Sequence, residues 1–324
     1  MTRVLTGIQS TGTPHLGNIL GAILPAINMA NDEENESFLF IADFHSLTQI
    51  KDRETLSDNT YAVAATWLAF GLDPEKTVFY RQSDVPEVTE LTWYLMCHYQ
   101  YQRLTLAHSF KDKSDRLADV NAGLFNYPML MAADILLYDA DEVPVGKDQQ
   151  QHIEMTREVA KKLNASTQKE LLVVPEAKIE TDLKLIPGTD GGKMSKSQKN
   201  FINIFLPEKE LKKQIMKIQT ASTSMEDPKD PEECNVFALY KLLGLPAQTE
   251  NLANKYKAGN FGFGHAKVEL LELILEKFRP QRERFLYYSE NRGEIDDILS
   301  EGAEKARSVA HKTLYRVRRE LGYS

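Results

Sequence analysis

Short apolar runs alternate with longer periodic segments through the first half of the chain, and this alternation constrains the fold more than any other feature. Residues 4–8 are the first strand candidate. Residues 38–43 form a continuous apolar run that ends in a carboxylate, as in a buried strand whose carboxyl end faces a crevice. Residues 78–80 are a shorter candidate, and residues 60–70 have helical character. The pattern predicts an α/β fold built on a parallel sheet.

A Pro- and Gly-rich stretch at residues 185–192 is too irregular for a helix or a strand. Beyond it, strand-like runs mostly disappear, and apolar residues recur at helical spacing in residues 208–218 and again before Pro280. A chain of 324 residues is long enough for two domains of moderate size. We therefore expect a sheet-containing domain over residues 1–190 and a mainly helical region over residues 191–324.

The charge of the chain limits its contacts with nucleic acid. A net charge of −8 argues against a general nucleic-acid coating protein, because phosphate binding rests on clustered Lys and Arg. A local basic patch at residues 302–324 is compatible either with RNA binding or with a solvated helix face. Its cations are Lys305, Arg307, Lys312, Arg316, Arg318 and Arg319.

Other classes of protein are disfavoured by what the sequence lacks. No stretch approaches the ~18 apolar residues that a membrane span needs, and residues 1–7 do not have the pattern of a secretory signal. We therefore expect a cytoplasmic protein without membrane contact. Cys97 and Cys234 lie far apart without further ligands at metal-binding spacing, so no structural zinc or iron–sulfur cluster is expected.

The turn after the first strand has the features of a phosphate site. It reaches Pro14, a residue favoured at the first position of a helix, which places His15 in the first helical turn. A helix N-terminus presents unpaired N–H groups and a positive dipole end to anions. His15 and Asn18 are three residues apart and share one helical face. The alternative is a glycine-tolerant helix that packs on the sheet.

A second motif lies on the Pro- and Gly-rich loop, where Lys193 and Lys196 follow two glycines. Two ammonium groups on such a loop can follow charge as it moves toward a transition state, which nucleotidyl transfer requires. The loop is not a Walker loop, because Met194 follows Lys193 and Pro187 stands six residues before it. The alternative is an exposed, solvated basic loop.

Together these motifs resemble the signatures of class I aminoacyl-tRNA synthetases. Residues 15–18, His-Leu-Gly-Asn, look like the HIGH signature, and residues 193–197, Lys-Met-Ser-Lys-Ser, match the KMSKS signature. Residues 127–138 and then 143–149 resemble the amino-acid-binding region of tryptophanyl-tRNA synthetases. The resemblance runs from residue 4 to at least residue 197 and narrows the family to the tryptophanyl enzymes.

The resemblance implies a tryptophan–tRNA ligase, which activates L-tryptophan with ATP to tryptophanyl-AMP and transfers it to the 3′ end of tRNA(Trp). It implies a Rossmann-like catalytic domain over residues 1–190. Residues 191–324 would contain the KMSKS loop and a helical, anticodon-binding region, whose last ~30 residues pack back on the catalytic domain. Mg²⁺ would arrive with ATP, with no metal held by protein side chains. The family further implies a homodimer.

The resemblance also assigns candidate residues to the substrates. Gln9, Lys193 and Lys196 are the expected catalytic residues, since they would stabilise charge on the phosphates. The expected ATP-binding residues are Gln9, Ser10, Thr11, His15, Gly17, Asn18, Gly146, Lys147, Asp148, Ile186, Lys193, Met194, Ser195, Lys196 and Ser197. The expected tryptophan-binding residues are Leu5, His45, Tyr127, Met131, Asp134 and Gln149.

Elementary chemistry supports part of this assignment. Asp134 stands in an apolar context, where a buried carboxylate needs a donor such as an indole N–H. Met131 lies three residues earlier on the same helical face, and its thioether suits an aromatic ring. The alternatives are a carboxylate paired with a neighbouring cation or backbone group, and a methionine of the core.

Three residues depart from the family pattern. Asn18 stands in place of the last histidine of HIGH, and this replacement is common in tryptophanyl enzymes. Leu5 stands where related enzymes often have an aromatic residue, and Lys147 stands beside Asp148 where an acidic residue is often found. Competing functions are a tyrosyl-tRNA synthetase, an inactive tRNA-binding or regulatory paralogue, and another nucleotidyltransferase. Both KMSKS lysines make an inactive paralogue the weaker choice.

Overall fold

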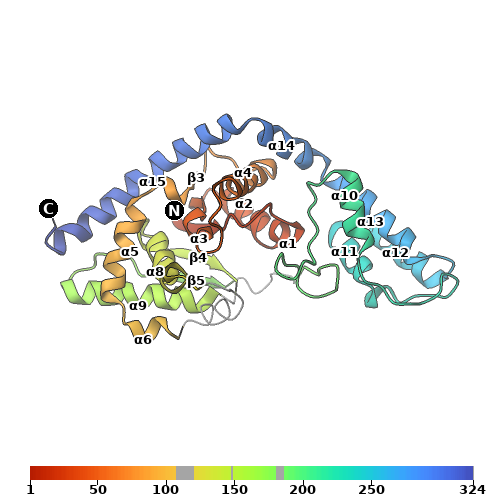
Figure 1. Cartoon of the computed structure of the whole chain (residues 1–324), viewed down its shortest axis with the longest axis horizontal. Coiled ribbons are helices and arrows are strands. Elements are labelled where there is room, and N and C mark those ends of the chain that lie inside the picture. Colours follow the sequence, from red (N-terminus) through yellow and green to blue (C-terminus); the bar gives the residue numbers. More distant parts are fainter. Residues whose placement is uncertain (107–119, 147–148, 180–185, 324) are drawn as a thin grey trace.

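The computed structural model describes residues 1–106, 120–146, 149–179 and 186–323. Within them, five strands form one parallel sheet in the order β3-β2-β1-β4-β5 (Figure 1). The strands are β1 (Thr2–Ile8), β2 (Asn35–Ile41), β3 (Val78–Arg81), β4 (Glu142–Val145) and β5 (Glu176–Ile179). The predicted α/β fold with a parallel sheet is confirmed. The order reverses between β1 and β4, which is where ligands of such sheets bind, beyond the carboxyl ends of the strands.

The helices of the first half surround this sheet. They are α1 (Leu16–Asn18), the π-helical turn η1 (Ile19–Ile23), α2 (Leu24–Ala30), α3 (Asp43–Ser46), α4 (Arg53–Ala69), the short η2 (Gln82–Asp84), α5 (Glu87–His98), α6 (Tyr101–Leu104), α8 (Ala122–Leu136) and α9 (Gln150–Thr167). The described part of the second half is mainly helical, as predicted. Its helices are α10 (Glu208–Met216), η4 (Pro231–Glu233), α11 (Asn235–Leu243), α12 (Pro246–Ala258), α13 (Phe263–Lys277), α14 (Arg279–Glu290) and α15 (Arg292–Glu320).

Both faces of the sheet are buried, which explains the continuous apolar run in β2. Successive residues of a strand point to opposite faces. Leu39 and Ile41 therefore join a core with α2, α4 and the helices α10 to α14. Phe38 and Phe40 join a second core with α5, α8, α9 and α15. The helical second half thus shares a continuous core with the face of the sheet that carries Leu39 and Ile41.

The last helix, α15, runs back along the molecule and packs on β3 and α5 (Figure 1). Gly302 allows this approach, because a Cβ atom there would lie 1.8 Å from the Phe79 carbonyl oxygen. Asp296 is anchored to the sheet end by Arg81 at 2.7 Å and by the Tyr61 hydroxyl at 2.9 Å. The C-terminal helix is therefore fixed to the sheet-containing half. No helix among the described residues is long and apolar enough to cross a membrane.

Candidate active site

The turn between β1 and α1 is closed by a capping box. The His15 Nδ1 atom accepts from the Asn18 backbone N–H at 3.2 Å, and the Asn18 side chain accepts from the His15 backbone N–H at the same distance. His15 is the N-cap residue, so the helix begins at Leu16 and not at Pro14, because the side chain of His15 replaces a backbone bond at the helix start. The two residues that were expected to share a face are thus locked together.

His15 is neutral in this position. Burial, and secondly the positive charge of Lys196, lower the pKa of His15 to about 4. The unprotonated ring nitrogen can therefore accept the Asn18 N–H near pH 7. The other ring nitrogen is available as a neutral hydrogen-bond donor to a ligand in the adjoining pocket.

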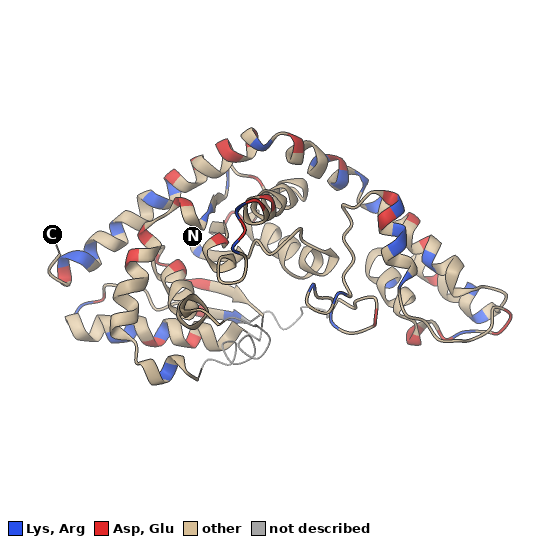
Figure 2. Ribbon diagram, in the orientation of Figure 1, with Lys and Arg blue, Asp and Glu red and all other residues tan. Residues whose placement is uncertain are grey.

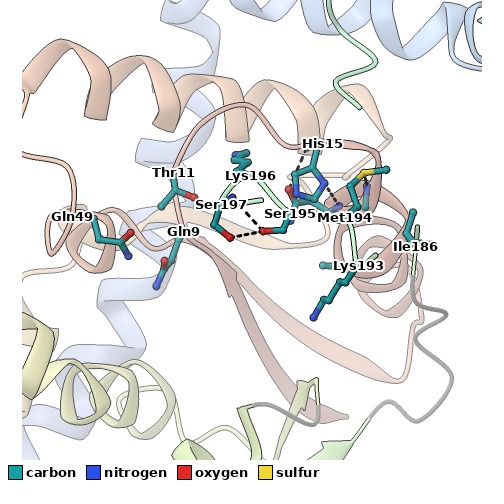
Figure 3. Close-up of a pocket in the computed structure, with 14 residues that line it drawn as sticks. Gln9, Thr11, His15, Gln49, Ile186, Lys193, Met194, Ser195, Lys196 and Ser197 are labelled. Atoms are coloured by element: carbon teal, nitrogen blue, oxygen red, sulfur yellow. Dashed lines mark hydrogen bonds between the residues drawn. The ribbon is translucent and has the colours of Figure 1, made fainter. Parts of the chain in front are cut away.

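The KMSKS loop packs directly on this turn (Figure 3). The Gly17 N–H donates to the Met194 sulfur at 3.2 Å. A Cβ atom at Gly17 would lie 3.0 Å from the His15 ring and 3.2 Å from Met194, so only glycine fits without displacement. The Met194 backbone N–H bonds to the Ile186 carbonyl oxygen at 2.9 Å. Two motifs that are half a chain apart therefore meet in one contact.

The two lysines of the loop have different environments. The Lys196 amine donates to the Gly12 carbonyl oxygen at 2.8 Å, and burial lowers the pKa of Lys196 to about 8. Gly12 has φ of 118°, a conformation that favours glycine. Lys193 is exposed and points away from Lys196 (Figure 3). One cation is thus held on the first motif while the other reaches outward.

These motifs surround a cavity of about 760 Å³, here called the nucleotide pocket. Eleven of the expected ATP-binding residues line it, together with three that were not in the expected set, Gly21, Ala22 and Gln49. The lining residues are Gln9, Thr11, His15, Gly17, Asn18, Gly21, Ala22, Gln49, Ile186, Lys193, Met194, Ser195, Lys196 and Ser197.

A second cavity of about 440 Å³, here called the side-chain pocket, opens beside it at the switch between β1 and β4. All six expected tryptophan-binding residues line it, and Gln9 and Ala22 line both cavities. The lining residues are Leu5, Thr6, Gly7, Gln9, Ala22, Phe40, Ala42, His45, Tyr127, Met131, Asp134, Ile135, Val143, Pro144, Val145, Gly146 and Gln149.

One face of α8 forms a wall of the side-chain pocket. Tyr127, Met131 and Asp134 are spaced by four and three residues, which places them on one side of the helix. Asn121 caps this helix by accepting from the Leu124 N–H at 3.1 Å. Leu5 stands where related enzymes often have an aromatic residue, and in this chain Phe40 on the neighbouring strand contributes an aromatic ring to the pocket lining.

Asp134 is a buried lining residue of the side-chain pocket and is held by two donors. It accepts from Gln82 Nε2 at 2.7 Å and pairs with His45 Nε2 at 2.8 Å. Burial raises the pKa of Asp134, while hydrogen bonds from His45 and then Gln82 oppose this shift. The sequence missed Gln82, because η2 is 52 residues from Asp134 along the chain.

Tyr127 and Gln149 are joined through a residue that the sequence also missed. The Tyr127 hydroxyl lies 2.9 Å from His152 Nε2, and His152 Nδ1 lies 3.0 Å from Gln149 Oε1. His152 is buried on α9. This chain of contacts orients both polar groups in the side-chain pocket.

Some expected ATP-binding residues lie elsewhere. Ser10 is fully buried and donates to the Ser46 hydroxyl at 3.0 Å, away from the nucleotide pocket, because the turn directs its side chain into the interior. Gly146 lines the side-chain pocket instead of the nucleotide pocket. Lys147 and Asp148 lie outside the described residues. Among those described, no three His, Cys, Asp or Glu side chains are grouped to hold a metal ion.

Comparison with known proteins shows the family of the chain. Residues 1–279 match the family of tRNA synthetases class I (W and Y). The chain belongs to this family. It is 46% identical to the tryptophan–tRNA ligase of Fusobacterium nucleatum, over 99% of this chain and 98% of that protein. It is 47% identical to the tryptophan–tRNA ligase of Rhodopirellula baltica, over 99% of both chains.

The fold is also similar to that of tryptophanyl-tRNA synthetases of known structure. A crystal structure of tryptophanyl-tRNA synthetase from Campylobacter jejuni, complexed with ADP and tryptophan, superimposes with a TM-score of 0.95. That chain is 44% identical, and the match covers 99% of this chain and all of the other. This class I synthetase is therefore an aminoacyl-tRNA ligase of the tryptophan–tRNA ligase group. The tyrosyl alternative is disfavoured by the relatives, although an acidic pocket residue alone would suit either ring donor.

Proposed function

We propose that this synthetase activates tryptophan in the two adjoining pockets and transfers it to tRNA(Trp). The tryptophan carboxylate attacks the α-phosphorus of ATP, pyrophosphate leaves, and tryptophanyl adenylate remains bound. The terminal adenosine of tRNA then attacks the activated carbonyl, which releases AMP. The observation that carries this proposal is that Gln9 and Ala22 line both cavities, so the two reactants can meet above the end of β1.

The nucleotide pocket would act by positioning and by electrostatic stabilisation. Lys193 and Lys196 would bind the phosphates that leave as pyrophosphate, whereas Gln9, which lines both pockets, would contact the α-phosphate. His15 contributes a neutral donor because its pKa is lowered to about 4. Mg²⁺ would enter as part of the Mg–ATP substrate.

The side-chain pocket would select the indole ring. Asp134 accepts hydrogen bonds from His45 and Gln82, and a carboxylate with two oxygens has further acceptor capacity for an indole N–H. Met131 and Phe40 would pack on the ring. Tyr127 and Gln149 would receive the ammonium group, and the chain of contacts through His152 supports their orientation.

A homodimer is the oligomeric state that we propose. Three large apolar side chains are exposed close together in the sequence of α5, α6 and the residues after α6: Trp93 is 62%, Tyr101 is 70% and Leu106 is 57% exposed. Tyr101 also contacts the Phe125 ring, with ring centroids 5.5 Å apart. Exposed apolar groups of this kind mark protein interfaces.

Charging of tRNA tests the complete reaction. Purified protein with Mg–ATP and labelled tryptophan should attach label to a tRNA(Trp) transcript and not to tRNA(Tyr), and the label should be lost when the 3′ terminal ribose is oxidised beforehand. Labelled adenylate without charged tRNA would limit the function to activation. Neither product, in protein that still binds tryptophan, would favour an inactive paralogue.

A further inference from the structure

Asn200 lies immediately behind the KMSKS loop and is not part of either pocket. Its side chain is 3% exposed, and it uses its acceptor and both of its donors. The Oδ1 atom accepts from the Ser195 N–H at 2.7 Å. The Nδ2 group donates to Asp190 Oδ1 at 2.7 Å and to the Lys193 carbonyl oxygen at 3.0 Å. A single carboxamide thus holds both arms of the loop.

The surrounding backbone is closed around this side chain. The Thr189 N–H donates to the Asn200 carbonyl oxygen at 2.8 Å. A Cβ atom at Gly188 would lie 2.4 Å from Asn200 Nδ2, so glycine is needed for the carboxamide to reach its partners. Asp190 also accepts from the Gly192 N–H at 2.9 Å. These contacts fix the turn from which Lys193 starts.

We infer that Asn200 is a positioning residue for the activation step, which deepens the proposed function. It acts through the loop backbone on Lys193 and Lys196 and touches no substrate. Because positioning on the scale of 1 Å can change a rate by ~10²-fold, loosening this carboxamide should slow adenylate formation. The side-chain pocket is separate, so tryptophan affinity should be preserved.

Substitution with a matched control tests the inference. Asn200→Ala should lower kcat for tryptophan-dependent pyrophosphate exchange by ~10- to 100-fold and leave the equilibrium Kd for tryptophan unchanged. Asn203→Ala is the control, because Asn203 Oδ1 accepts from the Phe205 N–H in the same segment but outside the loop. Equal kcat values for Asn200→Ala and the wild type would overturn the inference.

A second substitution separates positioning from loss of side-chain volume. Asn200→Asp keeps an acceptor for the Ser195 N–H but loses both donors and places a carboxylate against Asp190 and the Lys193 carbonyl oxygen, so it should reduce kcat with native tryptophan affinity. A kcat for Asn200→Asp equal to that of the wild type would contradict the role.

Hydrogen exchange distinguishes failure of the positioning role of Asn200 from failure of the proposed function. The amide of Ser195 should exchange faster in Asn200→Ala whether or not any amino acid is activated, because it loses its acceptor. Unchanged exchange at this amide would overturn the positioning role. Absence of pyrophosphate exchange in the wild type would instead overturn the proposed function.

A different observation concerns the surface on which the tRNA substrate lies. The basic residues of α15 are mostly engaged with carboxylates: Arg316 pairs with Asp139, Arg318 with Glu90, and Arg307 with Glu87 at 3.3 Å. Lys305 and Arg319 pair with Glu301 and Glu320 on the same helix. In Figure 2, α15 accordingly alternates between the two charges. The C-terminal patch is therefore largely neutralised.

The lysines of α10 are in the opposite situation. Leu211 and Ile215 form the buried face of this helix. The outward face carries exposed lysines, none of which forms an ion pair with a residue that the structure describes, and Figure 2 shows blue on this helix: Lys209, Lys212, Lys213 and, at its C-cap, Lys217. Lys267 adds an ammonium group at the Met216 carbonyl oxygen, at 3.1 Å. Two carboxylates, Glu208 and Glu210, lie in the first turn.

We propose that this α10 lysine face binds the phosphate backbone of tRNA. The proposal rests on the proposed function, which requires a polyanionic substrate on a protein with net charge −8. Unpaired lysines gain more from phosphate than ion-paired ones, since no internal partner has to be released. Met216, 42% exposed among them, can contact a ribose or base.

Paired substitutions test the surface. Lys212→Gln with Lys213→Gln should raise the KM for tRNA in charging by ~10-fold. The slope of the logarithm of the tRNA binding constant against the logarithm of the salt concentration should become shallower by ~1 for each phosphate contact that is lost. Pyrophosphate exchange, which needs no tRNA, should be unchanged. The matched control is Lys76→Gln with Lys161→Gln, two exposed lysines outside α10.

The outcomes separate the two claims. Unchanged tRNA affinity and salt dependence in the α10 variant would overturn the docking surface. If the wild type charges no tRNA, the proposed function fails, and gel-shift binding of the same transcript still decides whether α10 binds RNA.

Discussion

At the scale of single residues, the proposed function assigns tryptophan selection to Asp134 and stabilisation of the phosphates to Lys196. Asp134→Ala removes the buried acceptor of the side-chain pocket and leaves His45 and Gln82 without this partner. An indole N–H that is buried without its acceptor costs ~1–3 kcal/mol, so tryptophan binding should weaken by ~10-fold or more. Lys196→Ala should instead slow adenylate formation by ~10²-fold with a smaller effect on tryptophan Kd. Calorimetric binding and exchange kinetics check this division, which equal losses of tryptophan affinity in both variants would refute.

The lowered pKa of Lys196 leads us to expect that ATP binding depends on pH. Burial lowers the pKa of its amine from 10.5 to about 8 in the free protein, so the amine loses its proton as the pH rises through 8. Bound phosphates favour the charged form and raise this pKa again. ATP binding should therefore take up a proton near pH 8 to 9 and weaken as the pH rises further.

Calorimetry in buffers of different ionisation enthalpy measures this uptake directly. Lys196→Arg is the control, because a guanidinium stays protonated over this range. Proton uptake of equal size in the Lys196→Arg variant would show that another group is responsible.

The residues that sequence reasoning could identify are those in short local motifs. His15, Lys193 and Lys196 lie in two such motifs, and Asp134 stands in a distinctive apolar helix. Gln82, His152 and Asn200 act through partners that only the folded chain brings close. Ser10 shows the converse limit, since a residue inside the right motif is turned into the interior.

At the scale of elements, the contact of α15 with β3 depends on the absence of a side chain. A Cβ atom at residue 302 would meet the Phe79 backbone oxygen, which cannot move without distorting β3. Gly302→Ala should therefore destabilise the protein by about 3 kcal/mol or more, at the upper end of the cost of overpacking. The expected result is a fall in Tm of several degrees.

Gly293→Ala is the control for this prediction. Gly293 lies in the same helix, and its added Cβ would have nothing within 4 Å. Alanine there should be neutral or slightly stabilising, because it favours helix more than glycine does. Equal Tm values for the two variants would contradict the packing of α15 on β3.

The elements were predictable where their pattern was long and apolar. β1, β2 and β3 agree with the expected strands to within a few residues, since each is buried on both faces. β4 and β5 are only four residues long, and β4 includes Pro144, so the pattern did not reveal them. The start of α1 was misplaced because a histidine side chain acts as its cap.

At the scale of the whole molecule, the exposed apolar residues of α5 and α6 predict self-association. The wild type should sediment at twice the 36.8 kDa mass of one chain. Trp93→Glu places a charge on a side chain that is 62% exposed, and it should shift the protein to the monomer because charges are disfavoured in an interface core.

Leu245→Glu is the matched control. Leu245 is 66% exposed at the start of α12, in the helical region away from α5. This variant should remain dimeric. If Trp93→Glu forms dimers as stable as those of the wild type, the interface lies elsewhere. If the wild type is a monomer, the proposed homodimer is wrong.

Amino-acid-dependent exchange of labelled pyrophosphate into ATP measures whether the paired pockets activate tryptophan. Exchange should be rapid with tryptophan and slow with tyrosine, and Asp134→Ala should lose this preference. Exchange with tyrosine alone would contradict the assignment of the side-chain pocket. No exchange with either amino acid, in folded protein that binds ATP, would contradict activation itself.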